Sequence, residues 1–347
     1  MNAVTRYVRD SFRTQVRPYK TGLPDLRHTD RILMLGSCFT DEVGLRLTAD
    51  MFDVVHNPFG EQYNPLSVAY ALQRVLDRRS FSVDELVRDD SGVWHSWWLH
   101  SRFSSTDASR LLSRANDALE LAGALAKKSD NSGRLWIMVT FGTAFCYSLV
   151  GDSGEKTVVA NCHKFRPSLF ECKRLDVEDI VGIWMPLLDR LQAVFPEISV
   201  IFTVSPVRYL SYGPQGNSLS KSILHLAVER LCKHPVASYF PAYEILTDDL
   251  RDYRFYASDM VHPSGDGADY VYAGLLGMLC DDKTLDLAKR CRNLRNRFEH
   301  RPLTDNPEAY ARFRQDSIEE VEKLIQSHPE LESRWHRFLN EEVTNDI

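Results

Sequence analysis

The segment ILMLGSCF, residues 32–39, decides the fold class of this chain of 347 residues. Its first four residues are apolar, which is typical of a strand buried on both faces of a parallel sheet. Thr40, Asp41 and Glu42 follow and indicate a helix start, because acidic side chains stabilise the first turn of a helix. Ser37 is therefore predicted on a sharp turn between a strand and a helix, with an exposed hydroxyl. A strand-to-helix turn of this kind can present a nucleophilic serine.

The alternation of strand and helix continues along the chain. Strands are predicted at 31–36, 52–56, 134–141, 199–204 and 237–240, and helices at 41–51, 65–78, 107–127, 176–194, 219–232 and 265–280. Residues 145–160 are predicted to form a hairpin that turns within residues 151–154. Strands that alternate with helices indicate an α/β fold with a mostly parallel, doubly wound sheet.

Two segments do not fit this alternation. Residues 79–106 are irregular and rich in aromatic side chains, which suits either sugar stacking near a cleft or a loop with its own small core. Residues 283–347 are predicted to be wholly helical and charged, with breaks near Pro302 and Pro329. This extension could serve as a docking or dimerisation arm, or simply present a solvated charged face. The predicted organisation is an α/β domain over residues 1–282 and a helical extension over 283–347.

The composition restricts the class of protein. The net charge of −6 argues against a nucleic-acid partner, since phosphate binding needs a basic face. No window has the roughly 18 apolar residues of a membrane helix, and residues 1–20 lack the apolar core of a secretory signal. The seven cysteines form no Cys-x-x-Cys pair, which indicates free thiols in a reducing cytoplasm. No cofactor or metal site is predicted, and His95, His100 and His163 are not favoured as ligands.

The segment DMVHPS, residues 259–264, provides an acid and a histidine three residues apart. With Ser37 they could form an acyl-transfer triad, in which His262 takes the serine proton and Asp259 holds the imidazole tautomer. The order serine, aspartate, histidine is one that hydrolases on α/β sheets use. A structural alternative is a helix N-terminus, with Pro263 in the first turn and Ser264 as the cap.

Polar residues and glycine follow several predicted strands. Ser37, Gly60 and Thr143 should converge in the crevice at the carboxyl ends of the strands, where ligands bind in such folds. The backbone N–H groups of Ser37 and Gly60 are candidate oxyanion donors. Cys38 is a rival nucleophile, because a helix N-terminus can activate a thiolate, but the side chain after such a serine commonly packs elsewhere.

Three asparagines and a histidine are further candidates for the site. Asn57, Asn64 and Asn161 could donate from their side-chain amides, and His163 follows Asn161 closely. Asn57 and Asn64 each precede a proline, which favours roles in a turn and a helix cap. Asn161 and His163 could line the site or belong to a polar loop.

The separated motifs resemble the GSCFA domain family over roughly residues 20–280, and several motifs in the same order make the resemblance specific. The motifs are Gly36-Ser37-Cys38-Phe39, Asn57-Pro58-Phe59-Gly60, Tyr63-Asn64-Pro65, Phe141-Gly142-Thr143, Asn161-Cys162-His163-Lys164, residues 203–208, Ser220-Lys221, residues 239–244 and residues 259–264.

The family is similar to the SGNH/GDSL hydrolases, which implies a flavodoxin-like three-layer α/β/α fold. The resemblance implies that Ser37 is the nucleophile, Gly60 the oxyanion glycine, and Asp259 and His262 the acid–base pair. The usual Gly-x-Asn block after the middle strand is absent, so Thr143 or Asn161 would have to replace its donor.

The resulting hypothesis is a serine esterase that acts through an acyl-enzyme. Its substrate would be an acylated, most simply acetylated, carbohydrate or another small ester. A carbohydrate O-acyltransferase using the same site is an alternative, in which a sugar hydroxyl replaces water. A carbohydrate- or ligand-binding module without catalysis is the alternative from another class.

Overall fold

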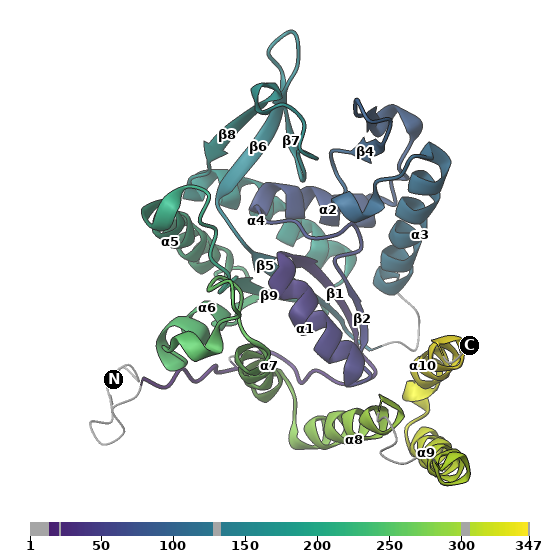
Figure 1. The fold of residues 1–347 in the computed structure, drawn as a ribbon. Helices are drawn as coiled ribbons and strands as arrows, with labels where there is room; N and C mark the ends of the chain where they lie inside the picture. The colour runs from purple at the N-terminus through teal and green to yellow at the C-terminus, as the bar shows by residue number, and fades with distance from the viewer. Residues whose placement is uncertain (1–13, 21, 128–132, 300–305, 346–347) are drawn as a thin grey trace.

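The computed structural model describes residues 14–20, 22–127, 133–299 and 306–345 (Figure 1). Its centre is a sheet of five parallel strands in the order β10-β9-β5-β1-β2. The strands are β1 (Arg31–Gly36), β2 (Asp53–His56), β5 (Leu135–Phe141), β9 (Ser199–Val204) and β10 (Ala237–Tyr239). The predicted parallel sheet is thus confirmed. The order is that of flavodoxin, in which the winding direction reverses between the first and third parallel strands, here β1 and β5.

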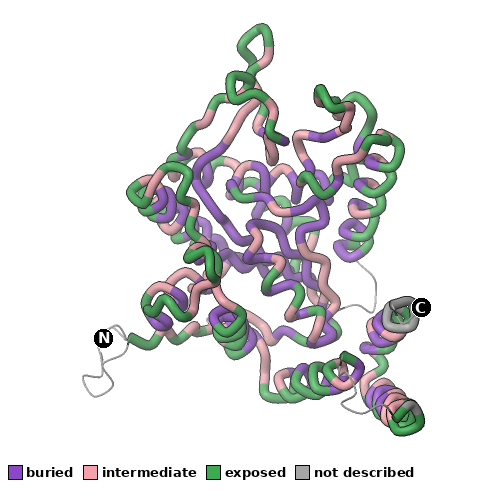
Figure 2. The backbone as a smooth tube through the Cα atoms, viewed as in Figure 1, coloured by how far each residue is buried: buried purple, intermediate pink, exposed green. Residues whose placement is uncertain are grey.

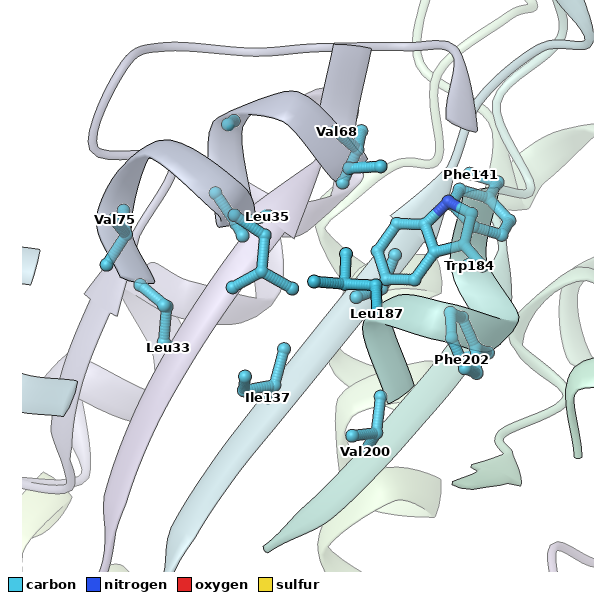
Figure 3. Packing of buried hydrophobic residues seen from close by; sticks show 14 of the residues in the cluster. Leu33, Leu35, Val68, Val75, Ile137, Phe141, Trp184, Leu187, Val200 and Phe202 are labelled. Atoms are coloured by element: carbon cyan, nitrogen blue, oxygen red, sulfur yellow. The ribbon is translucent and has the colours of Figure 1, made fainter. Parts of the chain in front are cut away.

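Alternate side chains of the strands point to opposite faces of the sheet, as the strand period of two requires. Leu33, Leu35 and Ile137 belong to a core shared with four helices, part of which is shown in Figure 3. These helices are α2 (Pro65–Asp77), α3 (Ala108–Ala126), α4 (Val177–Val194) and α5 (Gly213–Leu231).

Ile32 and Met34 point to the other face of the sheet, into a core formed with α1 (Cys38–Ala49) and α7 (Gly265–Leu279). The short helical turns α6 (Ala242–Glu244) and η4 (Ile245–Asp249) add to this core. The two cores account for the buried trace along the middle of the molecule (Figure 2). The three-layer α/β/α architecture is therefore confirmed.

Two smaller sheets accompany the central one. The hairpin predicted over 145–160 is confirmed as antiparallel β6 (Phe145–Val150) and β7 (Lys156–Val159). A third strand, β8 (Phe170–Arg174), pairs with β6 and was not predicted. Only three residues separate the end of β5 from the start of β6, so this sheet rises from the carboxyl ends of the central strands (Figure 1).

The aromatic insertion contains a small hairpin and packs against the rest of the protein. Its elements are η1 (Val83–Glu85), β3 (Leu86–Arg88), β4 (Trp94–Ser96) and η2 (Ser101–Phe103). The element η3 (Pro167–Leu169) lies outside the insertion, between two phenylalanines that contact it. The Trp97 ring lies 5.0 Å from that of Phe165 and 5.5 Å from that of Phe170. Trp98 packs edge-on against Tyr70 at 5.6 Å. Phe81, Leu99 and Phe103 belong to the same core as Leu33 and Ile137, so the alternative of a loop with its own core is wrong.

The C-terminal part is helical wherever the structure describes it. After η5 (Tyr253–Phe255) and α7, the elements are α8 (Asp282–Glu299), α9 (Pro307–Ser327), η6 (Pro329–Leu331) and α10 (Glu332–Asn345). The predicted break at Pro302 lies outside the described residues, whereas Pro329 begins η6. These helices share a small core with Met51, just beyond α1. Because α1 runs back along the sheet from Ser37, this core lies near the amino-terminal ends of the strands, and Ser37 lies at their carboxyl ends. The boundary at residue 283 stays a prediction.

Two helix starts differ from the prediction. Helix α1 begins at Cys38 rather than residue 41, and α5 begins at Gly213 rather than residue 219. Both early turns contain residues without apolar periodicity, which is the signal that the prediction used. None of the described helices is both long and apolar enough to cross a membrane.

Candidate active site

The turn after β1 requires glycine at position 36. Gly36 has φ of +148°, and a Cβ atom there would lie 2.2 Å from the carbonyl oxygen of Thr140 on β5. No side chain fits in that space, so β1 and β5 can approach closely at the point where the chain turns. Ser37 follows as the N-cap residue of α1. The predicted strand-to-helix turn is therefore present.

The prediction that the Ser37 hydroxyl is exposed is wrong, because Ser37 is only 1% exposed. Gly142 covers it, since the two residues approach closely enough that a Cβ on Gly142 would lie 3.2 Å from the Ser37 Cβ. The hydroxyl does not cap α1, and the amide of Thr40 donates to the Ser37 carbonyl instead, at 2.8 Å. Within the described chain, the Ser37 Oγ has no hydrogen-bond partner.

A pocket of about 320 Å³ lies beside this hydroxyl, at the carboxyl ends of β1, β5 and β9. Ser37 and Thr143, from the loops after β1 and β5, line it together with His262. The pocket therefore occupies the place where the fold predicts a ligand site. Cys38, Tyr63 and Arg208 contribute further lining.

The loop that carries His262 is built around the Asp259 carboxylate. Asp259 Oδ1 accepts the amides of Val261 and His262, each at 2.9 Å. Its other oxygen, Oδ2, lies 2.6 Å from His262 Nδ1. The hydrogen bonds from the His262 amide, the His262 ring and the Val261 amide lower the pKa of Asp259 to about 2.

The ionised Asp259 therefore holds the proton on His262 Nδ1 and leaves Nε2 as the basic nitrogen. The His262 side chain is 48% exposed, so this nitrogen can be reached from the pocket or from solvent.

Lys221, on α5, joins two of the loops that form the pocket. It is fully buried, and its Nζ donates to the carbonyl oxygens of Gly142 and Ser205, both at 2.7 Å. Burial without a carboxylate partner lowers the pKa of Lys221 to about 7. The neighbouring Ser220 Oγ accepts the amide of Ala144 at 2.7 Å, so α5 fixes the loop after β5 at two points.

The predicted oxyanion donors are engaged elsewhere. The amide of Ser37 donates to Thr140 O at 3.2 Å, and that of Gly60 to Asn57 O at 2.8 Å. The amide of Thr143 donates to Tyr63 O at 2.9 Å. The Thr143 hydroxyl lies 3.1 Å from Ser220 Oγ. Gly60 does not line the pocket, and a Cβ on it would meet the His100 side chain at 2.1 Å.

Two other amides are candidates for this role. Cys38 and Phe39 occupy the first turn of α1, where N–H groups have no partner within the helix. Among the described residues, neither amide has a backbone acceptor. Both amides lie at the positive end of the α1 dipole, and Cys38 also lines the pocket.

Asn57 and Asn64 have structural roles and do not line the pocket. Asn57 is completely buried, where its Oδ1 accepts the Gly36 amide at 2.9 Å and its Nδ2 donates to Ser37 O at 3.3 Å. Asn64 caps α2, since its Oδ1 accepts the Ser67 amide at 2.9 Å. Asn57 therefore has a role in a turn and Asn64 a role as a helix cap. Asn57 also fixes the turn that carries Ser37.

Asn161 and His163 lie in a loop fastened to the aromatic insertion, and neither lines the pocket. Asn161 Oδ1 accepts the His163 amide at 2.8 Å, and His163 Nε2 lies 2.8 Å from Ser96 O. Burial lowers the pKa of His163 to about 4. Neither residue is placed to replace the asparagine of the Gly-x-Asn block that this sequence lacks.

Cys38 lines the pocket next to Ser37. Burial, together with nearby Glu61 and Asp41, raises the pKa of its thiol to about 11, although the Phe39 amide acts in the opposite direction. The thiol is therefore protonated at neutral pH. Among the described residues, no group of three His, Cys, Asp or Glu side chains is arranged to hold a metal ion.

Sequence reasoning missed Lys221 and Arg208 as residues of the site. Lys221 had a usable signal, because it lies on the buried stripe of α5 with Asn217, Leu224 and Val228. A lysine on such a stripe is unusual and indicates a specific buried partner. Arg208 had no comparable signal, since its position depends on how the loop after β9 folds.

The model of the GSCFA family matches residues 31–274, which is more than half of the chain and includes both Ser37 and His262. The chain belongs to the GSCFA family. A comparison with curated protein sequences gives no significant match for this GSCFA protein.

Three solved structures are similar in fold. A candidate platelet activating factor from Streptococcus pneumonia is 13% identical, with a TM-score of 0.38, and the match covers 74% of this chain and 84% of that one. A carbohydrate esterase family 3 protein from Talaromyces cellulolyticus is 9% identical, with a TM-score of 0.34 and coverage of 75% and 98%. A candidate acylhydrolase from Bacteroides fragilis is 11% identical, with a TM-score of 0.35 and coverage of 78% and 91%. At this level of similarity the three structures carry no argument about the activity of the GSCFA protein.

Proposed function

We propose that this GSCFA protein is a serine esterase that acts through an acyl-enzyme on a small acyl ester. One observation carries the proposal. A single pocket is lined by Ser37, whose hydroxyl has no hydrogen-bond partner among the described residues, and by a histidine whose other ring nitrogen is held by an ionised aspartate. A histidine so oriented can accept the serine proton as the nucleophile attacks.

In the first half of the reaction, Ser37 Oγ forms a bond to the ester carbonyl carbon while its proton moves to His262 Nε2. The carbon–oxygen bond to the alcohol then breaks, and His262 returns the proton to the departing alcohol. In the second half, His262 takes a proton from water, whose oxygen attacks the acyl carbon. The bond between that carbon and Ser37 Oγ breaks, His262 returns the proton to Ser37 Oγ, and the acid leaves. Ser37 and His262 are not hydrogen-bonded in the structure, so substrate binding must bring them together, as occurs in many hydrolases.

The negative charge on the carbonyl oxygen would be stabilised by the first turn of α1. In the described part of the chain the amides of Cys38 and Phe39 have no backbone acceptor, and the buried Lys221 adds positive charge behind the pocket when protonated. This arrangement differs from the predicted one, which used Gly60 with Thr143 or Asn161. Fixed dipoles of this kind stabilise charge in the transition state without reorganisation.

The competing functions are distinguished by the second half of the reaction and by the need for Ser37. An O-acyltransferase would pass the acyl group to a hydroxyl rather than to water, and the exposed side of His262 leaves room for either acceptor. A binding module would need no reactive serine. The tryptophans of the insertion do not line the Ser37 pocket, so they do not support a sugar as the alcohol.

The test uses p-nitrophenyl acetate and two neighbouring substitutions. Ser37→Ala is expected to lower hydrolysis to the background rate while leaving the unfolding midpoint near that of the wild type. Cys38→Ala is the matched control and should retain most of the activity. A fluorophosphonate probe should label the wild type and Cys38→Ala at Ser37. Full activity in Ser37→Ala, or absence of labelling, would show that the protein is not a serine esterase.

A further inference from the structure

A second pocket adjoins the Ser37 pocket and shares one wall with it. Its volume is about 260 Å³, and it lies between the loop after β9 and the residues around η4 and η5. Arg208 lines both pockets. Met260 lines the second pocket while Val261 and His262 line the first, so the loop that carries His262 forms the partition between them.

The second pocket contains two arginines whose charge is not neutralised. Arg208 and Arg251 are both exposed, and within the described chain neither has an ion pair or a side-chain hydrogen bond. The one carboxylate in the lining belongs to Asp252. Its Oδ1 accepts the amide of Arg254 at 3.0 Å, and its Oδ2 lies 3.8 Å from Arg254 Nε. The pocket therefore has two cations available for a ligand.

Apolar and aromatic side chains complete the second pocket. Tyr253 is 77% exposed and Met260 is 52% exposed, although both are large side chains that usually pack against others. The Tyr253 and Tyr256 rings lie 6.3 Å apart, with an angle of 48° between their planes. Such a surface offers a flat organic group contact area next to the two guanidinium groups.

We propose that this second pocket binds an organic oxyanion, a carboxylate or a phosphate monoester, that belongs to the substrate of the Ser37 site. The inference rests on the proposed esterase function for the statement that the anion and the ester are parts of one molecule. Guanidinium groups recognise both oxyanions by paired, charge-assisted hydrogen bonds. Because Arg208 lines both pockets, an anion bound to it lies within the length of a small molecule from Ser37. The substrate is then an anionic ester rather than a neutral one.

The first experiment measures binding in Ser37→Ala protein, so that catalysis plays no part. Phenyl phosphate and phenylacetate are the anionic probes, and benzyl alcohol is the neutral one, with dissociation constants obtained by calorimetry at pH 7.5. Both anions, or one of them, should bind at least tenfold more tightly than benzyl alcohol. Arg208→Gln and Arg251→Gln should each weaken anion binding about tenfold, which is the effect of losing one charge-assisted hydrogen bond. Arg110→Gln, which removes an exposed arginine of α3, is the control and should change nothing.

Equal binding of phenyl phosphate, phenylacetate and benzyl alcohol would overturn the inference, and so would anion binding that is unchanged in both arginine variants. The comparison of phosphate with carboxylate identifies which oxyanion is preferred.

The second experiment tests whether the anion and the ester share one site. The better-binding anion should inhibit p-nitrophenyl acetate hydrolysis competitively in the wild type, and Arg208→Gln should raise the inhibition constant about tenfold. Anion binding without inhibition would overturn the link to the Ser37 site. If Ser37→Ala keeps its esterase activity while anion binding still depends on Arg208, the esterase mechanism fails and the anion pocket stands.

Discussion

Replacement of Lys221 by methionine should make the stability of the protein less dependent on pH. Methionine has nearly the same length as lysine but no charge and no donor. In the wild type, Lys221 Nζ is buried between the carbonyl oxygens of Gly142 and Ser205, at 2.7 Å from each. Burial lowers the pKa of Lys221 from its usual 10.5 to about 7. The folded protein therefore loses this proton near pH 7, whereas the unfolded chain keeps it up to about pH 10.5.

The sign of the effect follows from proton linkage. Between pH 7 and 10.5 the unfolded state binds more protons than the folded state, so the free energy of unfolding rises with pH. A difference in pKa from 10.5 to about 7 corresponds to a total of about 5 kcal/mol, at 1.36 kcal/mol per pH unit. Most of the rise that can be measured falls between pH 6 and 9, where the same two pKa values give about 3 kcal/mol.

The assay is urea unfolding followed by tryptophan fluorescence, at pH 6 and pH 9, for wild type and Lys221→Met. The quantity compared is the wild-type free energy of unfolding minus that of the variant, because groups common to both proteins then cancel. This difference should be larger at pH 9 by about 3 kcal/mol. Lys156→Met, which removes an exposed lysine of β7, is the matched control and should show the same difference at both pH values.

A wild-type minus Lys221→Met difference that is constant within about 0.5 kcal/mol would refute the reasoning. That result would mean that Lys221 keeps its proton throughout this range. A difference that falls with pH would refute it as well, because it would require the folded state to bind the proton more tightly than the unfolded chain does.

Two further substitutions test how the site is held together. Asp259→Asn keeps an oxygen for the two loop amides but places an NH₂ group opposite His262 Nδ1, which moves the imidazole proton to Nε2. Esterase kcat should fall by about 10⁴ with the unfolding midpoint unchanged, and a fall of less than tenfold would remove the orienting role of Asp259. Asn57→Ala leaves the Gly36 amide buried without its acceptor and removes one of the two donors to the Ser37 carbonyl, so urea unfolding should show a loss of about 1–3 kcal/mol. A loss below about 0.5 kcal/mol would mean that water replaces the amide there.

The central sheet could be predicted from the sequence because β1, β5 and β9 are buried on both faces. Leu33 and Ile32 both had to be apolar, since one side chain packs on the α2–α5 layer and the other on α1 and α7. The third strand of the small sheet, β8, could not be predicted in this way. Its sequence FECKR is mostly polar, and none of its residues is buried, so hydrophobic periodicity marks neither its length nor its partner.

In the candidate site, a contact within one loop could be predicted from the sequence, whereas contacts between loops could not. Asp259 and His262 pair within one loop, so their spacing of three residues was enough to predict the contact that the structure shows. The oxyanion donors depend on which carbonyl each amide meets when loops from different strands come together. The Gly60 amide is taken by Asn57, three residues before it in the same turn, and that of Thr143 by Tyr63 from another loop. Residue type alone carries no information about either contact.

The neighbouring Ser37 and Cys38 respond differently to the same surroundings. Both lie at the start of α1, where free amides favour negative charge. A thiol must ionise before it attacks, and with a pKa of about 11 only roughly one Cys38 in 10⁴ is a thiolate at pH 7. Ser37 needs no such population, because its proton leaves during the attack if His262 receives it. Burial therefore suppresses the thiolate of Cys38, which is the intrinsically better nucleophile. The same amides remain available for the negative charge that develops on a substrate bound at Ser37.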